Sequence, residues 1–530
     1  MTTARALIDR HGSTLSAERR RELGSHPTPE PLARVLVEVA IDHLGHVPGL
    51  VVDPSCGAGS FLLAAADALV ERGVPPAEVP GRLAGCDADP AAVVHCREAL
   101  RRWSAERGVT DLAAGDVRIL DPLAEATPWG GRVDLVVGNP PFLAQRTSDT
   151  ARDDAARDGL QRRFGVLGPY TDTSAAFLLV ASELLDVEGV AVMIQPQSFL
   201  AARDSEAVRD LLSTRTRLVA MWADDGRHFD AEVDVCAPVL RRTATPEHRV
   251  QLRWGPTARL IGHGSLPLPG TSWAPLLAAG LGLPDDDGGT ASSDDVGDRS
   301  TLGDVATTAA GFRDEFYALA AAARSCGDAG WSARAAPLVT VGMVDVARID
   351  RRTPRRFGGR RVSDPRLDRR ALRRDAPRVA EWVRRRAVPK VLVATQTKVI
   401  EAAADPTGRL VPVTPVVSVE PRPDSGIDVW DVLAVLSAPP VALDVARSAA
   451  GSGLSTRAVR VSAAGLRSVA LPLAVDAWRV GALRARELQG APPHARREGL
   501  RRLGESMCIA YGVDPAGQVL DWWLSHAERV

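Results

Sequence analysis

The sequence predicts an α/β protein whose first half forms a doubly wound, mostly parallel sheet, followed by a lobe of mixed α+β structure. Three observations lead to this prediction. Short apolar runs alternate with helical patterns through the first half, which is typical of βαβ units. Gly, Pro and Asp punctuate the carboxyl ends of these runs, where parallel sheets bind ligands. Beyond residue 300 the pattern changes to short β-like runs separated by loops.

Length and composition indicate several domains and no membrane span. A chain of 530 residues is expected to form two or three domains. No stretch reaches 18 uninterrupted apolar residues, and the start lacks a basic region followed by an apolar one. We therefore expect a cytoplasmic protein without membrane contact. The six cysteines are scattered without a Cys-x-x-Cys pair, which argues against a bound metal.

The first expected elements frame a glycine loop. Pro27-Thr28-Pro29 is a turn that can start a helix over residues 30–44. A buried strand at Leu50-Val51-Val52 then runs into Asp53-Pro54-Ser55-Cys56-Gly57-Ala58-Gly59-Ser60, and an Ala/Leu-rich helix follows to about residue 70. Gly57 and Gly59 let the backbone approach a ligand closely. The loop is neither a dinucleotide fingerprint nor a P-loop, so neither NAD nor ATP is favoured.

The next two strands each carry an acid. The strand over residues 83–86 ends at Asp87, where a carboxylate can accept hydrogen bonds from ribose hydroxyls. The run over residues 113–117 predicts a third strand, with Asp116 at its end and placed to bind the adenine amino group of a cofactor. Each acid alone is more often a helix cap. Together, at successive strand ends, they indicate a nucleoside-bearing cofactor.

The fourth strand, residues 135–137, ends in Gly138-Asn139-Pro140-Pro141-Phe142. Neither proline has an amide hydrogen, and each holds the preceding residue extended, so the turn is rigid. The side-chain carbonyl of Asn139 and the carbonyl of Pro140 are two acceptors beside the flat Phe142 ring. This combination suits an aromatic ring with an exocyclic amino group, such as an unstacked adenine. The alternative is a proline-rich loop with a buried Phe.

The remaining elements complete the division of the chain. After a polar insert over residues 143–170, we expect a helix over 173–185 and a fifth strand over 189–194. Later β-like runs lie at residues 337–341, 390–393, 413–419 and 470–473. Residues 285–299 have the composition of a linker. The expected parts are a charged helical arm, 1–25; the α/β domain, 26–245; a connecting region with the linker, 246–300; a second domain, 301–475; and a helical segment, 476–530.

Basic charge is concentrated in the second half. Residues 351–386 carry 15 arginines against four acids, although the net charge of the chain is −1. Phosphate binding requires such a local basic patch. The alternative is a solvated helix surface whose charges form salt bridges.

Taken together, residues 26–240 resemble an N6-adenine DNA methyltransferase of the gamma arrangement, in which cofactor motifs precede the catalytic one. The resemblance rests on Pro27-Thr28-Pro29, the loop 53–60, Gly85-Cys86-Asp87-Ala88-Asp89-Pro90, Gly115-Asp116 and Gly138–Phe142. It implies the fold of class I S-adenosylmethionine-dependent methyltransferases. It also implies that Thr28, Asp53, Pro54, Gly57, Gly59, Asp87 and Asp116 bind S-adenosylmethionine.

The resemblance assigns the chemistry as well. Asn139, Pro140, Pro141 and Phe142 would hold a flipped adenine, and Phe229 matches a second stacking aromatic. Many relatives have Tyr at the position of Phe142, and stacking survives that change. The acceptors of Asn139 and Pro140 would localise the lone pair of the amine in line with the sulfonium methyl, so positioning supplies most of the catalysis.

The second half resembles, more loosely, the target-recognition domain of TaqI-like and type I restriction systems over residues 301–475. That implies double-stranded DNA as partner, with Arg384, Arg385, Gln396 and the two lysines, Lys390 and Lys398, addressing phosphates and base edges. No nuclease motif is present, so cleavage would require a separate nuclease or defence-system subunit.

Two alternatives to a DNA adenine methyltransferase remain open. Protein-glutamine and some RNA methyltransferases use the same Asn-Pro-Pro chemistry, usually without a large basic C-terminal lobe. A methyltransferase-like subunit that binds cofactor and DNA without turnover is the other.

Overall fold

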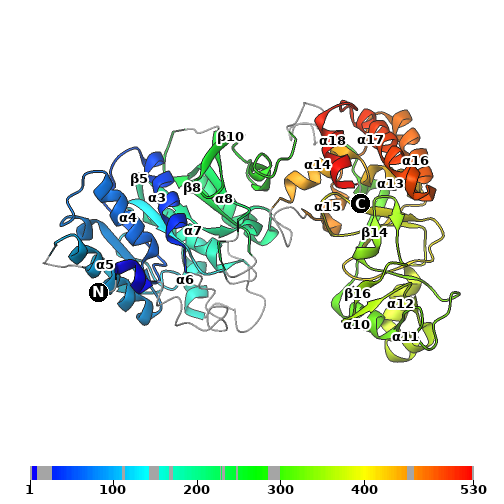
Figure 1. Ribbon diagram of the computed structural model, residues 1–530, viewed down its shortest axis with the longest axis horizontal. Helices are drawn as coiled ribbons and strands as arrows, with labels where there is room; N and C mark the ends of the chain where they lie inside the picture. The colour runs from blue at the N-terminus through cyan, green and yellow to red at the C-terminus, as the bar shows by residue number, and fades with distance from the viewer. Residues whose placement is uncertain are drawn as a thin grey trace. The chain divides into compact units, whose positions relative to one another are not determined.

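The computed structural model describes residues 3–8, 27–109, 114–142, 154–165, 171–226, 228–229, 233–245, 249–284, 299–450 and 459–527. The chain divides into two compact units, Met1–Leu281 and Gly282–Val530, and each is described by itself (Figure 1). Most of the expected N-terminal arm, residues 1–25, and of the expected linker, 285–299, lies outside the described residues.

Unit 1 is built on one large sheet. Its strands are β1 (Val51–Asp53), β2 (Leu83–Asp87), β3 (Asp116–Ile119), β4 (Val133–Gly138), β5 (Leu185–Met193), β6 (Gln195–Pro196), β7 (Arg217–Ala223), β8 (Val235–Arg241), β9 (Arg249–Trp254) and β10 (Arg259–Ser265). Their order in the sheet is β10-β9-β7-β8-β5-β4-β1-β2-β3, with β6 paired to β8. The five strands from β3 to β5 are parallel, and β8 runs antiparallel to both β5 and β7.

The strand order reverses direction at β1 and β4. Right-handed crossovers on either side of such a point place helices on both faces of the sheet. The helices are α3 (Glu30–Leu44), α4 (Ser60–Glu71), α5 (Pro90–Glu106), α6 (Asp154–Phe164), α7 (Thr173–Leu184) and α8 (Glu206–Arg215). The predicted doubly wound, mostly parallel sheet is therefore confirmed, and ligands of such sheets bind where the order reverses.

Local sequence explains these elements. β1 and β4 are the central strands, and nearly all of their residues are buried, as expected for strands covered on both faces. Pro29 precedes α3 as its N-cap, and Gly45 ends the helix with φ +79°. The side chain of Asp172 caps α7 by accepting from the Ser174 amide, 2.9 Å away.

Two expectations for unit 1 differ from the structure. β3 starts at Asp116, so this residue opens the strand instead of ending it. The stretch 246–300, expected to be a connection, contributes β9 and β10 to the sheet. No residue of β10 is buried, so its sequence lacks the apolar run that would predict a strand.

Unit 2 combines a small antiparallel sheet with many short strand pairs. The sheet has the order β11 (Ala306–Ala310), β23 (Val417–Pro421), β19 (Lys390–Val393) and β21 (Ala402–Asp405). The short pairs are β12 (Ala323–Arg324) with β18 (Arg366–Leu367), β13 (Leu338–Val339) with β22 (Val411–Pro412), β14 (Val344–Asp345) with β15 (Arg348–Ile349), β16 (Arg355–Phe357) with β17 (Arg360–Val362), and β20 (Gln396–Thr397) with β24 (Val459–Arg460).

The helices of unit 2 fall into two groups around that sheet. They are α9 (Leu302–Val305), α10 (Arg313–Ala322), α11 (Arg369–Asp375), α12 (Pro377–Arg385), α13 (Val429–Leu436), α14 (Pro439–Ser448), α15 (Ala463–Arg467), α16 (Val475–Gly490), α17 (Arg496–Tyr511) and α18 (Gln518–Ala527). Val391 and Val393 of β19 enter a core shared with α13 to α18. Leu392, pointing the other way, enters a core shared with α10 to α12.

This packing connects the expected C-terminal helical segment with the rest of the unit. Helices α16, α17 and α18 share one core with α13 and α14, so the segment 476–530 is part of the same hydrophobic unit. The expected β-like run at 470–473 makes only an isolated bridge, between Ala470 and Thr301. The mixed α+β character of the lobe is as predicted.

Among the described residues, no single helix is long and apolar enough to span a membrane. Helices α13 and α14 reach the required length and hydropathy only as a pair bent by 58°.

Candidate active site

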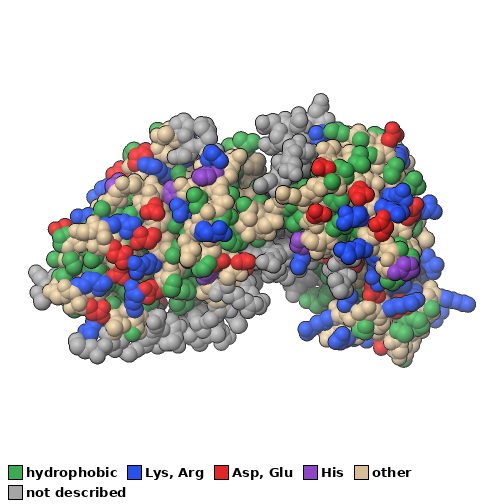
Figure 2. All heavy atoms as spheres, turned by 45° about the horizontal axis from the view of Figure 1, so that its top comes forward, with side chains coloured by type: hydrophobic (Ala, Val, Ile, Leu, Met, Phe, Trp, Pro, Cys, Tyr) green, Lys and Arg blue, Asp and Glu red, His purple; other side chains and the backbone are tan. Residues whose placement is uncertain are grey.

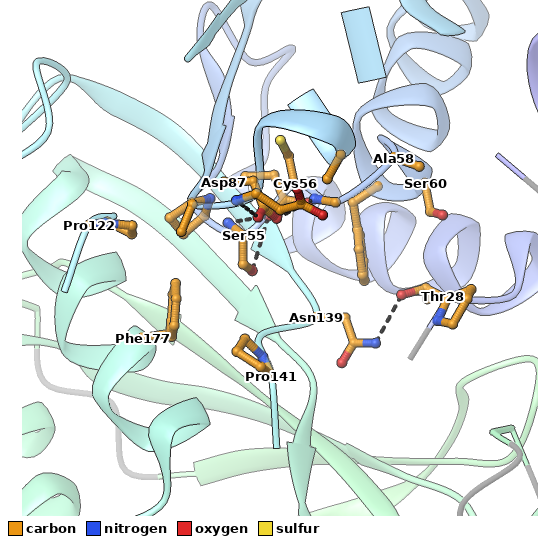
Figure 3. Close-up of a pocket in the computed structure, with 18 of the residues that line it drawn as sticks. Thr28, Ser55, Cys56, Ala58, Ser60, Asp87, Pro122, Asn139, Pro141 and Phe177 are labelled. Atoms are coloured by element: carbon orange, nitrogen blue, oxygen red, sulfur yellow. Dashed lines mark hydrogen bonds between the residues drawn. The ribbon is translucent and has the colours of Figure 1, made fainter. Parts of the chain in front are cut away.

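A cavity of about 270 Å³ opens at the carboxyl ends of β1, β2, β3 and β4 (Figure 3). Asp53, Asp87 and Asn139 come from the ends of β1, β2 and β4, and Asp121 follows β3. Phe177 of α7 supplies an apolar wall. The cavity therefore lies where the strand order reverses, with acids from three neighbouring strands around it.

Asp53 is the most deeply buried acid of the cavity. Its residue is 2% exposed, and its carboxylate accepts from the amide of Ser55 at 2.9 Å and from the Ser55 hydroxyl at 3.4 Å. Burial raises the pKa of Asp53 to about 8, because removal from water disfavours the charged form. Gly138 lies against this carboxylate, and a Cβ there would come within 2.8 Å of Oδ1. A larger residue before Asn139 would displace Asp53.

Asp87 holds the glycine loop beside β2. Its Oδ2 accepts from the amide of Gly57 and its Oδ1 from the amide of Asp89, both at 2.9 Å. Burial raises the pKa of Asp87 as well. The N-cap of α5 is Asp89, whose side chain accepts from Ala91. The structure thus separates Asp87 from helix capping and leaves it facing the cavity.

The two glycines of the loop have different roles. Gly57 lines the cavity with φ +50°, and its amide points to Asp87. Gly59 lies outside the described lining of the cavity, as N-cap of α4 with φ +99°. A Cβ at Gly59 would come within 2.9 Å of Cys96 Sγ, so glycine is required there for packing of α4 on α5. Pro54 lines the cavity beside Gly57.

Asn139 is oriented by the turn before α3. Its side-chain nitrogen Nδ2 donates to the hydroxyl of Thr28 at 3.0 Å, across 111 residues of sequence (Figure 3). This bond places the amide nitrogen toward Thr28. Pro141 lines the cavity as well, whereas Pro140 is buried outside its lining.

Phe142 meets Phe229 at this site. The two rings contact edge to face, with centroids 6.2 Å apart and an interplanar angle of 87°. The structure therefore brings together the two aromatic residues that the sequence singled out, from segments 87 residues apart.

A buried pair that the sequence analysis missed lies beside Phe229. His228 Nε2 is 2.7 Å from the carboxylate of Asp224, which also accepts from the amide of Gly226 at 3.1 Å. The His228 ring lies 5.8 Å from Trp222. These contacts hold the end of β7 and the residues leading to Phe229. The only sequence signal for this pair was the spacing of an acid and a histidine four residues apart after an apolar strand. The same spacing is common on ordinary helices, so it does not identify a site.

The prediction that Asp116 ends the third strand is wrong. Asp116 begins β3 next to Ala84, and it forms an ion pair with Arg118 at 2.7 Å and accepts from Trp129 Nε1 at 2.9 Å. It does not line the cavity. Asp121 takes the place expected for Asp116, at the cavity beyond the carboxyl end of β3. The residue before it, Leu120, donates its amide hydrogen to the Asp87 carbonyl at 3.1 Å, which holds this segment beside the end of β2. The dipeptide Asp121-Pro122 repeats Asp53-Pro54, a signal that the sequence analysis passed over.

The residues expected to contact DNA in unit 2 have different environments. Arg384 and Arg385 are exposed on α12, but both lie near Glu381, at 2.7 and 4.0 Å. Lys398 is exposed after β20. Gln396 belongs to β20, and its side chain is outside the described part of the structure.

Lys390 does not fit the expected role. It is fully buried and pairs with Asp405 at 2.8 Å. Burial lowers the pKa of Lys390, and the ion pair opposes that shift. The expectation that this lysine addresses phosphates is wrong, because the β19–β21 pairing encloses its side chain.

The donor set of the unit 1 cavity suits an organic cation that carries a nucleoside. Two buried carboxyl groups with raised pKa values, Asp53 and Asp87, gain from a positive ligand charge. Within the described ranges, no group of three His, Cys, Asp or Glu side chains is placed to hold a metal ion.

Comparison with known proteins finds similarity over most of unit 1. A family model described as N-6 DNA Methylase matches residues 13–246. The chain is 32% identical over 119 residues to the Type I restriction enzyme MjaIX methylase subunit of Methanocaldococcus jannaschii, covering 22% of this chain and 19% of that protein. It is 31% identical over 146 residues to the Type II methyltransferase M.MamI of Microbacterium ammoniaphilum, covering 26% of this chain and 39% of that protein. The matched parts thus span less than half of either relative.

Two solved structures share the fold over most of the chain. One is the Type IIL restriction-modification enzyme MmeI in complex with DNA, with a TM-score of 0.63 and 11% identity, covering 99% of this chain and 82% of that one. The other is a DrdV–DNA complex, with a TM-score of 0.52 and 13% identity, covering 92% of this chain and 59% of that one. At these identities the similarity shows the fold.

Proposed function

We propose that this chain, whose residues 13–246 match the family model described as N-6 DNA Methylase, is a restriction-modification methyltransferase that methylates adenine N6 in DNA. The observation that carries the proposal is the placement of Asn139 on the cavity of Asp53 and Asp87, with Phe142 and Phe229 in contact beside it. DNA as substrate is supported by the description of the matching family model and by the DNA complexes of the proteins with similar folds.

The residues of unit 1 fit S-adenosylmethionine as cofactor. The fit rests on the raised pKa values of Asp53 and Asp87, which a cationic ligand would relieve, and on the open space beside the backbone of Gly57 in the cavity wall. Asp53 and Gly57 would hold the amino-acid end, Asp87 the ribose and Asp121 the adenine. The cofactor, when bound, supplies a methyl group on a positively charged sulfur.

The chain's own residues then position the second substrate. Asn139 Oδ1 and the Pro140 carbonyl would accept the two hydrogens of the target amine, which frees the nitrogen lone pair for attack. Thr28 fixes the direction of the Asn139 amide through the bond from Nδ2. Phe142 and Phe229 would contact the faces or edges of the target base, and the Asp224–His228 pair holds Phe229 in place. The reaction needs no covalent enzyme intermediate.

Direct product analysis tests the proposal. The full chain is incubated with S-adenosylmethionine and genomic DNA, and the digested nucleosides are separated by mass. We expect N6-methyladenine with the native chain and none with Asn139→Ala. Methylated glutamine in protein, or methylated adenine only in RNA, would replace the proposal with one of the alternatives. Long-read sequencing of DNA from expressing cells would give the methylated motif.

Binding of the cofactor is expected to depend on pH through Asp53. In the free protein this carboxyl is mostly neutral at pH 7, because its pKa is raised to about 8. A cation beside it lowers that pKa, so binding releases a proton, and affinity rises between pH 6 and pH 7.5 by up to about tenfold per unit. Calorimetry in two buffers of different ionisation enthalpy counts the released protons. Asp53→Asn is the control, and its affinity should rise less with pH than that of the native chain, the remaining dependence coming from Asp87. A flat profile in the native chain would contradict this assignment.

Asp121 and Asp116 form a matched pair for the adenine contact. Asp121→Ala is expected to weaken S-adenosylmethionine binding roughly 10- to 100-fold, the range for one hydrogen bond to a charged group. Asp116→Ala should leave affinity unchanged, because its carboxylate pairs with Arg118 away from the cavity. Calorimetric titration of both variants measures the difference. A loss of affinity confined to Asp116→Ala would instead assign the adenine contact to Asp116, the first residue of β3.

Residues 301–475 are proposed to form the target-recognition domain. Lys and Arg side chains are prominent in the part of unit 2 that carries α10, α11 and α12 (Figures 1 and 2). This placement supports contact with the DNA backbone, with exposed Lys398 as a candidate for base contact.

A further inference from the structure

A second cavity, of about 590 Å³, lies within unit 2 and is lined by arginines from four separate segments. It is bordered by β12, by the loop after it, by β18 with the start of α11, and by the loop after β21. The arginines are Arg324, Arg334, Arg366, Arg369, Arg370 and Arg409. Sequence alone placed only three of them in the basic stretch 351–386, so the fold has gathered the others.

Two of these arginines are held by the protein. Arg324 pairs with Asp368 at 3.3 Å. Arg366 pairs with Asp364 at 3.0 Å and donates to the carbonyls of Ala333 and Ala335. These bonds fix the side chains of Arg324 and Arg366 in the wall of the cavity.

The other four carry uncompensated charge. Among the described residues, no carboxylate pairs with the guanidinium group of Arg334, Arg369, Arg370 or Arg409, and all four are exposed. Asp368 is the single acid in the lining, and it is already engaged by Arg324 and by the amides of Arg370 and Ala371.

Some arginines on α11 and α12 outside the cavity are compensated by a neighbouring acid and provide a comparison. On the neighbouring helices, Arg374 pairs with Asp375 at 2.7 Å and Arg384 with Glu381 at 2.7 Å. Their charge is compensated locally. The cavity therefore gathers several positive charges, and its one acid, Asp368, is already paired. A ligand with several negative charges is stabilised most by such a site.

The chemistry of the lining selects phosphate groups. Guanidinium groups bind phosphate oxygens in pairs of parallel hydrogen bonds. No aromatic side chain lines the cavity that could stack on a base. The lining is therefore suited to a phosphate backbone and offers no aromatic surface for a stacked base.

We infer that this cavity binds consecutive backbone phosphates of the DNA substrate and anchors the duplex on unit 2 independently of sequence. The inference rests on the proposed function, since it names where that function's substrate is held. It moves the main phosphate contact away from Arg384 and Arg385, where the sequence pattern had placed it.

The test compares two triple variants of the full chain with the same change in charge. The first replaces Arg369, Arg370 and Arg409 with Ala, and the matched control replaces Arg374, Arg384 and Arg385 with Ala. Binding to a labelled duplex is titrated at several salt concentrations. The first variant is expected to reduce the slope of log affinity against log salt by about 2 to 3, with a loss on every DNA sequence alike. The control should change the slope by less than about 1.

Three readouts decide the outcome. Equal slopes for the two variants, or a larger change in the control, would overturn the inference. If tripolyphosphate raises the melting temperature of the native chain but not of the first variant, and DNA slopes do not differ, the site takes a small anion and the DNA assignment fails. Replacing the same three residues with Lys should restore the slope, since charge is kept. Failure of the proposed function would appear separately, as absence of N6-methyladenine while the slopes still differ.

Discussion

Replacing Asn139 with alanine is expected to lower the rate of methyl transfer at least about a thousandfold, or roughly 4 kcal/mol of barrier. The side-chain carbonyl of Asn139 is the acceptor that would draw hydrogen from the target amine. Affinity for S-adenosylmethionine should stay within about threefold, because the carboxylates that would hold the cofactor are on β1 and β2. Single-turnover methylation of a duplex and calorimetry with the cofactor measure the two effects.

Thr28→Val provides a graded control for the same site. It removes the hydroxyl that accepts from Asn139 Nδ2 at 3.0 Å but retains the shape of the side chain. We expect a loss in rate of about 10- to 100-fold, smaller than that of Asn139→Ala, since the amide can still reach its working orientation part of the time. Turnover of Asn139→Ala within about tenfold of the native rate would show that the catalytic assignment is wrong.

Much of unit 1 could be predicted because its signals are local. β1 and β2 end in Asp53 and Asp87, as the apolar runs indicated, and α3 spans Glu30–Leu44 as expected. The β3 boundary failed for a physical reason. β3 lies at the edge of the sheet and only Val117 in it is buried, so its apolar pattern is weak. Gly115-Asp116 before it looks like a strand end, although the strand starts there.

The site depended on contacts that no local pattern specifies. Thr28 meets Asn139 across 111 residues, and Phe142 meets Phe229 only because β7 and β4 end at the same edge of the sheet. The burial of Lys390 shows the same limit in unit 2. A lysine that opens a strand gives no sign in sequence that Asp405 on the neighbouring strand encloses it.

Replacing Asp87 with alanine is expected to weaken S-adenosylmethionine binding by about 100-fold or more, the sum of two charge-assisted hydrogen bonds to ribose. Part of this loss will come from the glycine loop, because Asp87 Oδ2 also accepts from the amide of Gly57. Asp89→Ala is the matched control. It removes the cap of α5, which costs about 1 kcal/mol of stability. Asp89 also lines the cavity, so a loss of cofactor affinity smaller than that of Asp87→Ala is expected.

A thermodynamic cycle separates the ribose contact from loop support. S-adenosylhomocysteine and its 2′-deoxyribose analogue are titrated into the native chain and into Asp87→Ala. If the carboxylate binds the ribose, the native chain prefers the hydroxylated ligand by about tenfold or more, and the variant binds both alike. Loop loosening alone would lower both affinities by the same factor and keep the preference. In that outcome Asp87 supports Gly57, and another residue must bind the ribose.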